Sequence, residues 1–474
     1  MNILVLDVGT SSMRGTLMDE TARALFGTQI KYRPSYGENG LAEQDPMDWV
    51  SAMKALCAGA AKDHPVDAIA LTSQRSSVIP ADKAGKPLMN AIMWQDSRNR
   101  AVCDSLKGRE ADIRAICGTG VNTVYSGGKM AWLRQERPDI YEKTKHLFVI
   151  PDYLIWLLTG NHVTDRTYGS RSMLMDLRKG EWSPELLRLF GVDRAKLGEL
   201  IPPSSVAGVV TAAFSAETGI PEGIPVITCG GDQQCGALGQ GVFQPEQVSV
   251  NLGTGAYLIA PVDQVPDNSH LICNASAVPG QYILESSVLT CGAALDWFFR
   301  EFGGDVTQVG QTLRQSPPGA NGVLVLPWFQ GRANPDWNSE ARAAFIGLTL
   351  ATAKHDMLRA LLESICVEVG GSLRQMTGTV REIRLSGGLS RTKELCQLLA
   401  DVTGVPVIAS DDSDATTRGA WMSAAKCLGK AETWGAVWEI AKPCQEQLFL
   451  PDLDLRSVYD RISKKTERLY DATK

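Results

Sequence analysis

The sequence predicts two α/β domains built on the same plan, and three observations support that fold class. The chain has 474 residues, which exceeds the size at which one hydrophobic core stops growing. The order strand, Gly-Thr turn, strand in LDVGTSSMRGTLMD near the start returns in SVNLGTGAYLIAP at residues 249–261. In residues 224–241 and again in 382–407, an apolar strand runs through two glycines into a helical pattern. Such a duplication would place two similar domains face to face.

The composition is typical of a globular protein that binds small solutes. Hydrophobic residues make up 44%, charged residues 21%, and the net charge is -6, so no basic excess indicates a nucleic-acid partner. The eleven cysteines form no C-x-x-C pair, and their odd number favours reduced thiols and a cytoplasmic location. Their dispersal, like that of the five histidines, argues against a zinc site. Because Asp7 interrupts the first apolar run and no run of about 18 apolar residues occurs, neither a signal peptide nor a membrane span is expected.

The first strand, NILVLDVGTSSMRG (2–15), ends in a carboxylate that is followed by a glycine, three hydroxyl residues and an arginine. Glycine turns leave backbone amides free to face an anion, so the segment predicts either a phosphate and metal site or an ordinary turn. After Gly9 the chain lacks both the Gly-Lys-Ser/Thr of a Walker loop and the G-x-G-x-x-G of a dinucleotide fold. These two nucleotide-binding classes are therefore excluded.

Asp232 follows Gly230 and Gly231 at a predicted helix N-terminus. The acid is either a helix N-cap or a general base that accepts a hydroxyl proton during phosphoryl transfer. Gly387 and Gly388, at another strand-to-helix junction, permit either the close approach of a flat ligand or tight packing. Phosphoryl transfer requires positioning, a metal and a base, and the glycine sites together supply such parts.

These ordered motifs resemble the FGGY carbohydrate kinases, a family that includes glycerol kinases and pentulose kinases. The resemblance covers nearly the whole chain and rests on LDVGTSSMRG, NAIMWQDSR (90–98), YSGGKMAWL (125–133), GGDQQCGALGQ, NLGTGAYL, ARAAFIGLTLATAKHDMLRALLESI (341–365) and LSGGLSRTKELCQLLADVTGVPV. It implies two duplicated actin-like domains, of the ribonuclease H-like superfold shared with the Hsp70 ATPase, with ATP and substrate in the cleft between them. We place the boundary near residue 241, with an N-terminal domain (1–241) that holds the substrate and base and a C-terminal domain (242–474) that binds ATP.

The resemblance further implies ATP-dependent phosphorylation of a terminal hydroxyl on a small sugar or polyol, with ATP and Mg²⁺ as cofactors. It assigns the catalytic base to Asp232 and the handling of Mg²⁺ to Asp7. The implied ATP-binding residues are Thr10, Ser11, Arg14, Gly253, Thr254, Gly255, Gly292, Gly387 and Gly388. The implied substrate-binding residues are Gln74, Arg75, Ser76, Trp94, Asp96, Asp232 and Gln233, although Trp94 alone would equally suit a core position.

The sequence departs from the family pattern on the substrate side. Ser76 replaces a carboxylate that grips glycerol hydroxyls in glycerol kinases, and Val124 stands where an aromatic, Met, Gly or Ser is usual. Loss of a charged acceptor removes about 1.5 to 3 kcal/mol per hydrogen bond. Both a ketose such as a pentulose and a glycerol-like polyol therefore remain as acceptors.

The C-terminal signature (343–363) resembles a helix that begins near Asp356, ends at Glu363 and packs mostly in the core. Neither nucleic acid nor membrane is expected as a partner, and a homodimer is the candidate assembly. The alternative is an ATP-binding regulatory or scaffolding protein of the same fold, because fold alone does not give function. Asp232 argues against it. A chaperone-like ATPase is excluded because residues 426–474 are too few for a peptide-binding segment.

Overall fold

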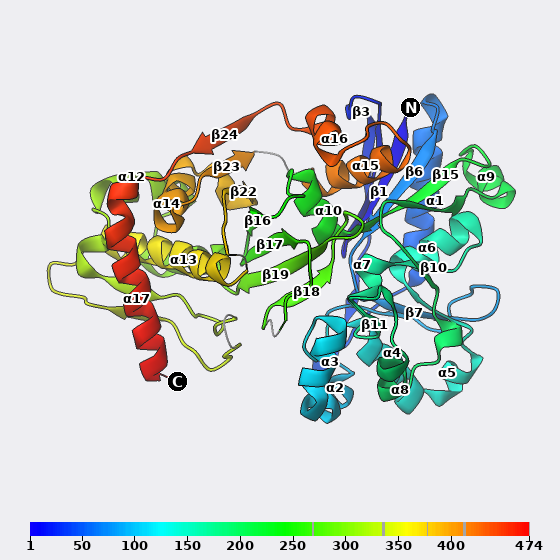
Figure 1. Cartoon of the computed structure of the whole chain (residues 1–474), viewed down its shortest axis with the longest axis horizontal. Helices are drawn as coiled ribbons and strands as arrows, with labels where there is room; N and C mark the ends of the chain where they lie inside the picture. Colours follow the sequence, from blue (N-terminus) through cyan, green and yellow to red (C-terminus); the bar gives the residue numbers. More distant parts are fainter. Residues whose placement is uncertain (268–269, 334–336, 377, 411–413, 474) are drawn as a thin grey trace.

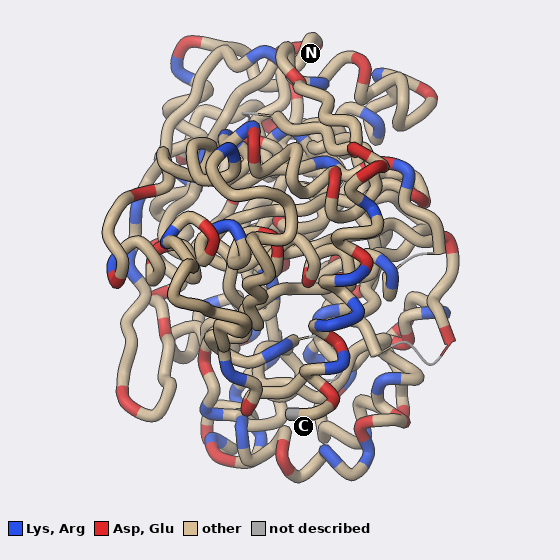
Figure 2. Tube along the Cα trace, turned by 90° about the vertical axis from the view of Figure 1, so that its left-hand side faces the viewer, with Lys and Arg blue, Asp and Glu red and all other residues tan. Residues whose placement is uncertain are grey.

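The computed structural model describes residues 1–473 apart from 268–269, 334–336, 377 and 411–413. It contains two large mixed sheets that lie side by side (Figure 1). Within the described residues, no helix combines the length and the apolar character needed to cross a bilayer. Figure 2 shows Lys and Arg interspersed with Asp and Glu over one face, without a stripe of one sign.

The first sheet has six strands in the order β14-β15-β6-β1-β2-β3. Their bounds are β1 (Ile3–Val8), β2 (Ser12–Met18), β3 (Ala24–Lys31), β6 (Ala68–Ser73), β14 (Ser205–Val209) and β15 (Pro225–Gly231). Strands β1, β2 and β3 form an antiparallel meander, whereas β6 is parallel to both β1 and β15. Strand β14 closes the far edge and is antiparallel to β15.

The second sheet repeats this pattern in the order β18-β19-β17-β16-β22-β23-β24. Its strands are β16 (Gln247–Leu252), β17 (Ala256–Val262), β18 (Ile272–Ala275), β19 (Tyr282–Val288), β22 (Glu382–Ser386), β23 (Val407–Ser410) and β24 (Glu446–Phe449). Strands β16, β17 and β19 are antiparallel to one another in turn, with β18 antiparallel to β19 at the edge. Strand β22 is parallel to β16 and to β23. Strand β24 is antiparallel to β23, as β14 is to β15. The predicted duplicated α/β fold is therefore confirmed.

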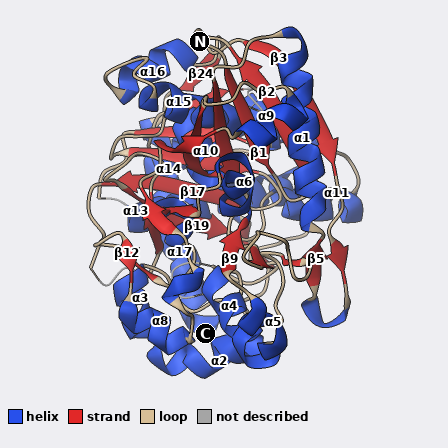
Figure 3. Ribbon diagram, turned by 90° about the vertical axis from the view of Figure 1, so that its right-hand side faces the viewer, coloured by secondary structure: helices blue, strands red, loops and turns tan. Residues whose placement is uncertain are grey.

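Alternate residues of β1 face two different cores, because successive side chains of a strand point to opposite faces. Leu4 and Leu6 pack with Trp49 and Met53 of α1 (Pro46–Asp63), whose N-terminus is capped by the preceding aspartate. Ile3 and Val5 pack with Trp421 and neighbouring residues of α15 (Ala415–Cys427) and α16 (Trp434–Ala441). Helices from both ends of the chain thus cover the first sheet, α1 on one face and α15 and α16 on the other (Figure 3).

Helix α15 is the structural link between the two halves. It packs tightly on α10 (Asp232–Gly239), the helix that follows β15. A Cβ atom added to Gly239 would collide with the carbonyl of Ala415, and one added to Gly419 would collide with the carbonyl of Cys235. The small residues let the two helix backbones approach closely. Although α15 follows residue 241 in the chain, its residues pack on the first sheet. A domain boundary near residue 241 therefore stays a prediction.

Helix α13 spans Lys354–Met376, so the sequence-based expectation that it ends at Glu363 is wrong. Buried residues continue beyond that point at helical spacing, with Val369, Leu373 and Met376 in the core of the second sheet. The expectation that this helix mainly packs in the core is confirmed.

The remaining elements complete the two halves. The other α-helices are α2 (Arg100–Leu106), α3 (Glu110–Cys117), α4 (Ser126–Glu136), α5 (Pro138–Lys143), α6 (Ile150–Thr159), α7 (Arg166–Gly169), α8 (Pro184–Phe190), α9 (Ala212–Thr218), α11 (Gly292–Phe302), α12 (Val309–Gln315), α14 (Lys393–Thr403) and α17 (Arg456–Thr473). The small sheets are formed by β4 (Ser35–Tyr36), β5 (Ala42–Gln44), β7 (Val78–Ala81), β8 (Ala91–Ile92) and β9 (His146–Val149), by β10 (Val163–Asp165) with β13 (Glu199–Ile201), by β11 (Met175–Asp176) with β12 (Glu181–Trp182), and by β20 (Leu324–Leu326) with β21 (Ala344–Ile346).

Candidate active site

The cavity beside Asp232 lies between helix α10 and the second sheet. It has a volume of about 190 Å³ and is lined by Asp232 and Gln233 from α10, and by Asn251, Tyr257 and Gly387 from the second half. A neighbouring cavity of about 130 Å³ is lined by Asp7, Gly9, Ser12, Arg14, Asp414 and Thr416. The structure therefore brings the two predicted acids, Asp232 and Asp7, to adjoining cavities in the cleft.

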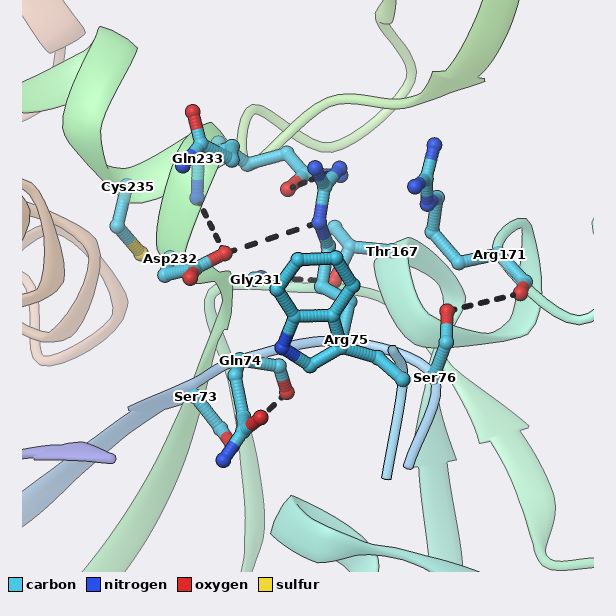
Figure 4. Close-up of polar contacts among 12 residues, drawn as sticks. Ser73, Gln74, Arg75, Ser76, Thr167, Arg171, Gly231, Asp232, Gln233 and Cys235 are labelled. Atoms are coloured by element: carbon cyan, nitrogen blue, oxygen red, sulfur yellow. Dashed lines mark hydrogen bonds and ion pairs between the residues drawn. The ribbon is translucent and has the colours of Figure 1, made fainter. Parts of the chain in front are cut away.

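Asp232 is the first residue of α10, directly after the Gly230–Gly231 end of β15. Its side chain is 29% exposed, and one carboxylate oxygen accepts the backbone N–H of Gln233 at 2.8 Å. The Nε of Arg75 lies 3.7 Å from the same oxygen (Figure 4). Burial raises the pKa of Asp232, whereas the positive charge of Arg75 lowers it, and burial prevails. The helix N-terminus further favours the ionised form.

Asp7 lies near the end of β1, opposite Arg14 on β2. Burial, together with the negative charge of Asp232, raises the pKa of Asp7 to about 7, although Arg14 opposes both effects. Arg14 forms an ion pair with Asp414, which precedes α15. The site thus holds three carboxylates close to one arginine, an arrangement that a cation would stabilise.

The first Gly-Thr turn is held by residues that sequence analysis assigned to substrate binding. The Oγ1 of Thr10 donates to Gln74 at 3.4 Å and accepts the indole N–H of Trp94 at 3.2 Å. The amide group of Gln74 also donates to the carbonyl of Gly9 at 3.0 Å. Gln74 and Trp94 therefore support the turn directly, while the side chain of Ser11 is exposed at its tip.

The second turn, Gly253–Gly255, is held by the start of helix α11. The N–H of Gly292 donates to the carbonyl of Gly253, and that of Cys291 to the carbonyl of Thr254, both at 2.9 Å. A Cβ on Gly292 would lie 2.6 Å from the Gly253 carbonyl, and one on Gly255 2.8 Å from the carbonyl of Val288. Close backbone packing thus explains Gly255 and Gly292 on its own.

The glycines after β22 differ from each other. Gly387 has φ 93°, and a Cβ there would collide with the Leu252 carbonyl, so the local backbone itself requires glycine. A Cβ on Gly388 would meet no atom within 4 Å, and a Cβ on Gly253 would meet no atom closer than 3.6 Å. Open space at these two positions is what a ligand lying on the backbone would need.

Two predicted substrate residues are engaged by the protein itself. Asp96 is fully buried, pairs with Arg98 at 2.8 Å and accepts the N–H of Ala42 at 2.7 Å. Ser76 has φ 73°, is 2% exposed and donates its hydroxyl to the carbonyl of Arg171 at 3.2 Å (Figure 4). Substrate contact by either side chain stays a prediction.

A buried ion cluster beside Asp232 was missed by sequence analysis. Glu285 of β19 pairs with Arg75 at 2.5 Å and with Arg171 at 3.4 Å, and accepts the amide of Asn274 at 2.9 Å. Burial would raise the pKa of Glu285, but the two guanidinium groups lower it to about 2. Arg75 thus bridges the first half to the second. The available signal was a lone acid in the apolar strand YILESSV.

Comparisons with known proteins agree with this architecture. Residues 2–239 match the model of the N-terminal domain, and residues 248–427 that of the C-terminal domain, of the FGGY family of carbohydrate kinases. A glycerol kinase from Trichlorobacter lovleyi is 33% identical over 478 aligned positions, which cover 95% of each chain. Glycerol kinase 2 from Thermotoga maritima is also 33% identical and covers 99% of this chain and 96% of its own.

Two solved structures have the same fold. The glycerol kinase of Plasmodium falciparum, with ADP, superposes with a TM-score of 0.90 at 26% identity, over 100% of this chain and 97% of that one. The xylulose kinase of Rhodospirillum rubrum gives a TM-score of 0.93 at 25% identity, over 100% and 99%.

Proposed function

Because this chain belongs to the FGGY family of carbohydrate kinases and is a phosphotransferase acting on an alcohol, we propose that it phosphorylates a terminal hydroxyl of a small sugar or polyol. In this proposal ATP is the donor, Mg²⁺ is required and Asp232 is the general base. The observation that carries the proposal is the position of Asp232, which is partly exposed in a cavity lined by both halves of the chain.

Asp232 has the properties of a base for an alcohol. A carboxylate with a raised pKa accepts a proton more readily, and Arg75 at 3.7 Å keeps it ionised. As the hydroxyl attacks the terminal phosphorus, its proton passes to Asp232 and ADP leaves. The position of Arg75 is fixed by its ion pair with Glu285, which also pairs with Arg171.

Asp7 fits a role in Mg²⁺ binding. It is a carboxylate whose pKa is raised to about 7 by burial and by Asp232, so a nearby cation would relieve the repulsion. Mg²⁺ prefers carboxylate oxygens, phosphate oxygens and water, and when bound would neutralise charge on the phosphates of ATP. We assign Asp7 to this ion, and the turns around Thr10 and Thr254 to the phosphates.

Either acceptor class remains within the proposal, since relatives include glycerol kinases and a xylulose kinase. Gln74, Arg75, Ser76, Trp94, Asp96 and Gln233 stay the proposed substrate-side residues. We keep the cytoplasm as the proposed compartment, because each of the eleven cysteines lies in the described residues as a free thiol. A homodimer stays the proposed assembly.

The direct test is a coupled assay of ADP release with glycerol, erythritol, pentitols, pentuloses, hexuloses and small hydroxyketones. We expect at least one acceptor to yield one phosphorylated product per ADP, and only when Mg²⁺ is present. ATP hydrolysis that no acceptor stimulates, or no turnover at all, would favour the non-catalytic ATP-binding alternative instead.

The proposed adenosine site gives a sharp prediction at Gly388. Because a Cβ there meets no protein atom within 4 Å, Gly388→Ala should leave the melting temperature within about 2 °C of wild type. The added methyl group would occupy space assigned to the nucleotide, so KM for ATP should rise about tenfold while KM for the acceptor stays constant. Steady-state kinetics and thermal unfolding measure both effects.

Gly435→Ala is the matched control, because that position in α16 also has no atom within 4 Å of an added Cβ and lies away from the cavities. An unchanged KM for ATP in Gly388→Ala would remove this glycine from the nucleotide site.

A further inference from the structure

The peptide bond between Gly230 and Gly231, one residue before Asp232, directly follows a β-bulge. Strand β15 pairs with β6 through Thr228 and Leu71 and then through Gly230 and Thr72, which leaves Cys229 as the extra residue. Gly230 has φ 100°, a conformation that favours glycine. Bulges redirect the end of a strand, and here the redirected end leads straight into α10.

Both polar groups of the peptide between Gly230 and Gly231 bind buried hydroxyls. Its carbonyl accepts the hydroxyl of Thr72 and that of Tyr168, each at 2.8 Å. Its N–H donates to the Oγ1 of Thr167 at 3.1 Å (Figure 4). All three side chains are 2% exposed or less. Because carbonyl and N–H belong to one rigid plane, the three bonds fix the orientation of that plane.

A buried carboxylate, that of Asp165, holds the residues around this peptide in place. One oxygen of Asp165 accepts the N–H of Thr167 at 2.7 Å, and the other accepts the hydroxyl of Thr228 at 2.8 Å. Asp165 therefore ties α7, which carries Thr167 and Tyr168, to β15 just before the bulge. The peptide is held from β6 on one side and from α7 on the other.

We propose that Thr72, Thr167 and Tyr168 are positioning residues for Asp232, because they fix the peptide plane one residue before it and thereby the direction in which the chain enters α10. This inference rests on the proposed function of Asp232 as the base. Rotation of the plane would swing the carboxylate away from the acceptor hydroxyl and from Arg75. A displacement of about 1 Å at a reacting group can cost roughly a hundredfold in rate.

The test removes the two hydroxyl donors to the Gly230 carbonyl, which also accepts the thiol of Cys235 at 3.6 Å. Tyr168→Phe and Thr72→Val should each lower kcat about tenfold, and the double variant about a hundredfold, with KM for ATP within about twofold of wild type. Thr72→Ser, which keeps the hydroxyl, should recover most of kcat. If the carboxylate moves away from Arg75, the apparent pKa on the acidic limb of the kcat profile should rise, because Arg75 lowers the pKa of Asp232.

Two matched controls separate positioning from loss of a buried hydrogen bond. Tyr141→Phe removes a buried hydroxyl that accepts the N–H of Asp193, and Thr144→Val one that donates to the carbonyl of Ile140. Both should keep kcat. Activity is expressed per folded molecule, with the folded fraction taken from thermal unfolding.

The inference is overturned if the double variant keeps wild-type kcat per folded molecule, or if Thr72→Ser is as slow as Thr72→Val. Failure of the proposed function looks different: Asp232→Asn would then turn over at the wild-type rate in the same assay. A fully active double variant beside an inactive Asp232→Asn therefore rejects positioning alone.

Discussion

Asp232→Asn should bind ATP with wild-type affinity, fold normally and lose about 10² to 10⁴ in the rate of acceptor phosphorylation. The amide of asparagine has nearly the shape of the carboxylate but cannot accept the hydroxyl proton. The substitution also removes the negative charge that faces Arg75 at 3.7 Å, yet Glu285 still neutralises that guanidinium at 2.5 Å. Little destabilisation is therefore expected.

The measurement is single-turnover phosphorylation of the acceptor identified in the screen, with ATP affinity from calorimetry and melting temperature from scanning fluorimetry. The wild-type rate should fall on the acidic side as Asp232 becomes protonated, and the residual rate of the variant should lack that limb. A variant with near wild-type single-turnover rate would reject Asp232 as the base, whatever its effect on KM.

The features that the sequence predicted are local. Both Gly-Thr turns, the strand before Asp232 and the junction at Gly387 follow from a few consecutive residues whose alternation and glycine content specify strand, turn and helix start. The duplication followed from comparing two such segments. These signals are strong because the physical cause, backbone conformation at glycine, lies within the segment itself.

The features that it missed depend on residues far apart in the chain. Arg75, Arg171 and Glu285 form one cluster although about a hundred residues separate each from the next. No periodicity in the sequence shows which acidic side chain will form an ion pair with which arginine. Likewise, the small and apolar residues of α15 indicate a helix buried on several sides, but not that it packs on the first sheet.

Motif boundaries also proved different from element boundaries. The resemblance ended a helix at Glu363 because the family signature ends there, whereas the apolar spacing runs on to Met376 through Gly370 and Gly371. Two glycines inside a helix cost about 1 kcal/mol each, and burial of the neighbouring residues in the second core offsets that cost.

Asp7→Asn should lower kcat/KM by at least about a hundredfold at any Mg²⁺ concentration, because a ligand or water-mediated partner of the ion loses its charge. The raised pKa adds a second, independent signature. Protons compete with the cation for a carboxylate of pKa about 7, so the Mg²⁺ concentration that half-saturates wild type should rise as pH falls from 8 to 6. In the variant this pH dependence should be absent.

Stability without metal should change in the opposite direction to activity. Because the folded-state pKa of Asp7 is raised from 3.8 to about 7, the ionised group opposes folding, fully above pH 7 and not at all well below pH 4. In EDTA at pH 8, Asp7→Asn should therefore be more stable than wild type, on the order of 1 to 3 kcal/mol in the free energy of unfolding. At pH 4 the gain should vanish, and added Mg²⁺ should raise the melting temperature of wild type only.

Asp104→Asn serves as the control, since that exposed acid on α2 pairs with Lys107 at the surface and its loss should change neither stability nor Mg²⁺ dependence appreciably. If Asp7→Asn melts at a lower temperature than wild type in EDTA at pH 8, the carboxylate is stabilised by its surroundings and not repelled by them. If its turnover also keeps the wild-type dependence on Mg²⁺ and pH, the ion is held elsewhere in the cleft. Asp414, which lines the same cavity as Asp7, and Asp232, which lines the adjoining one, then become the next to test.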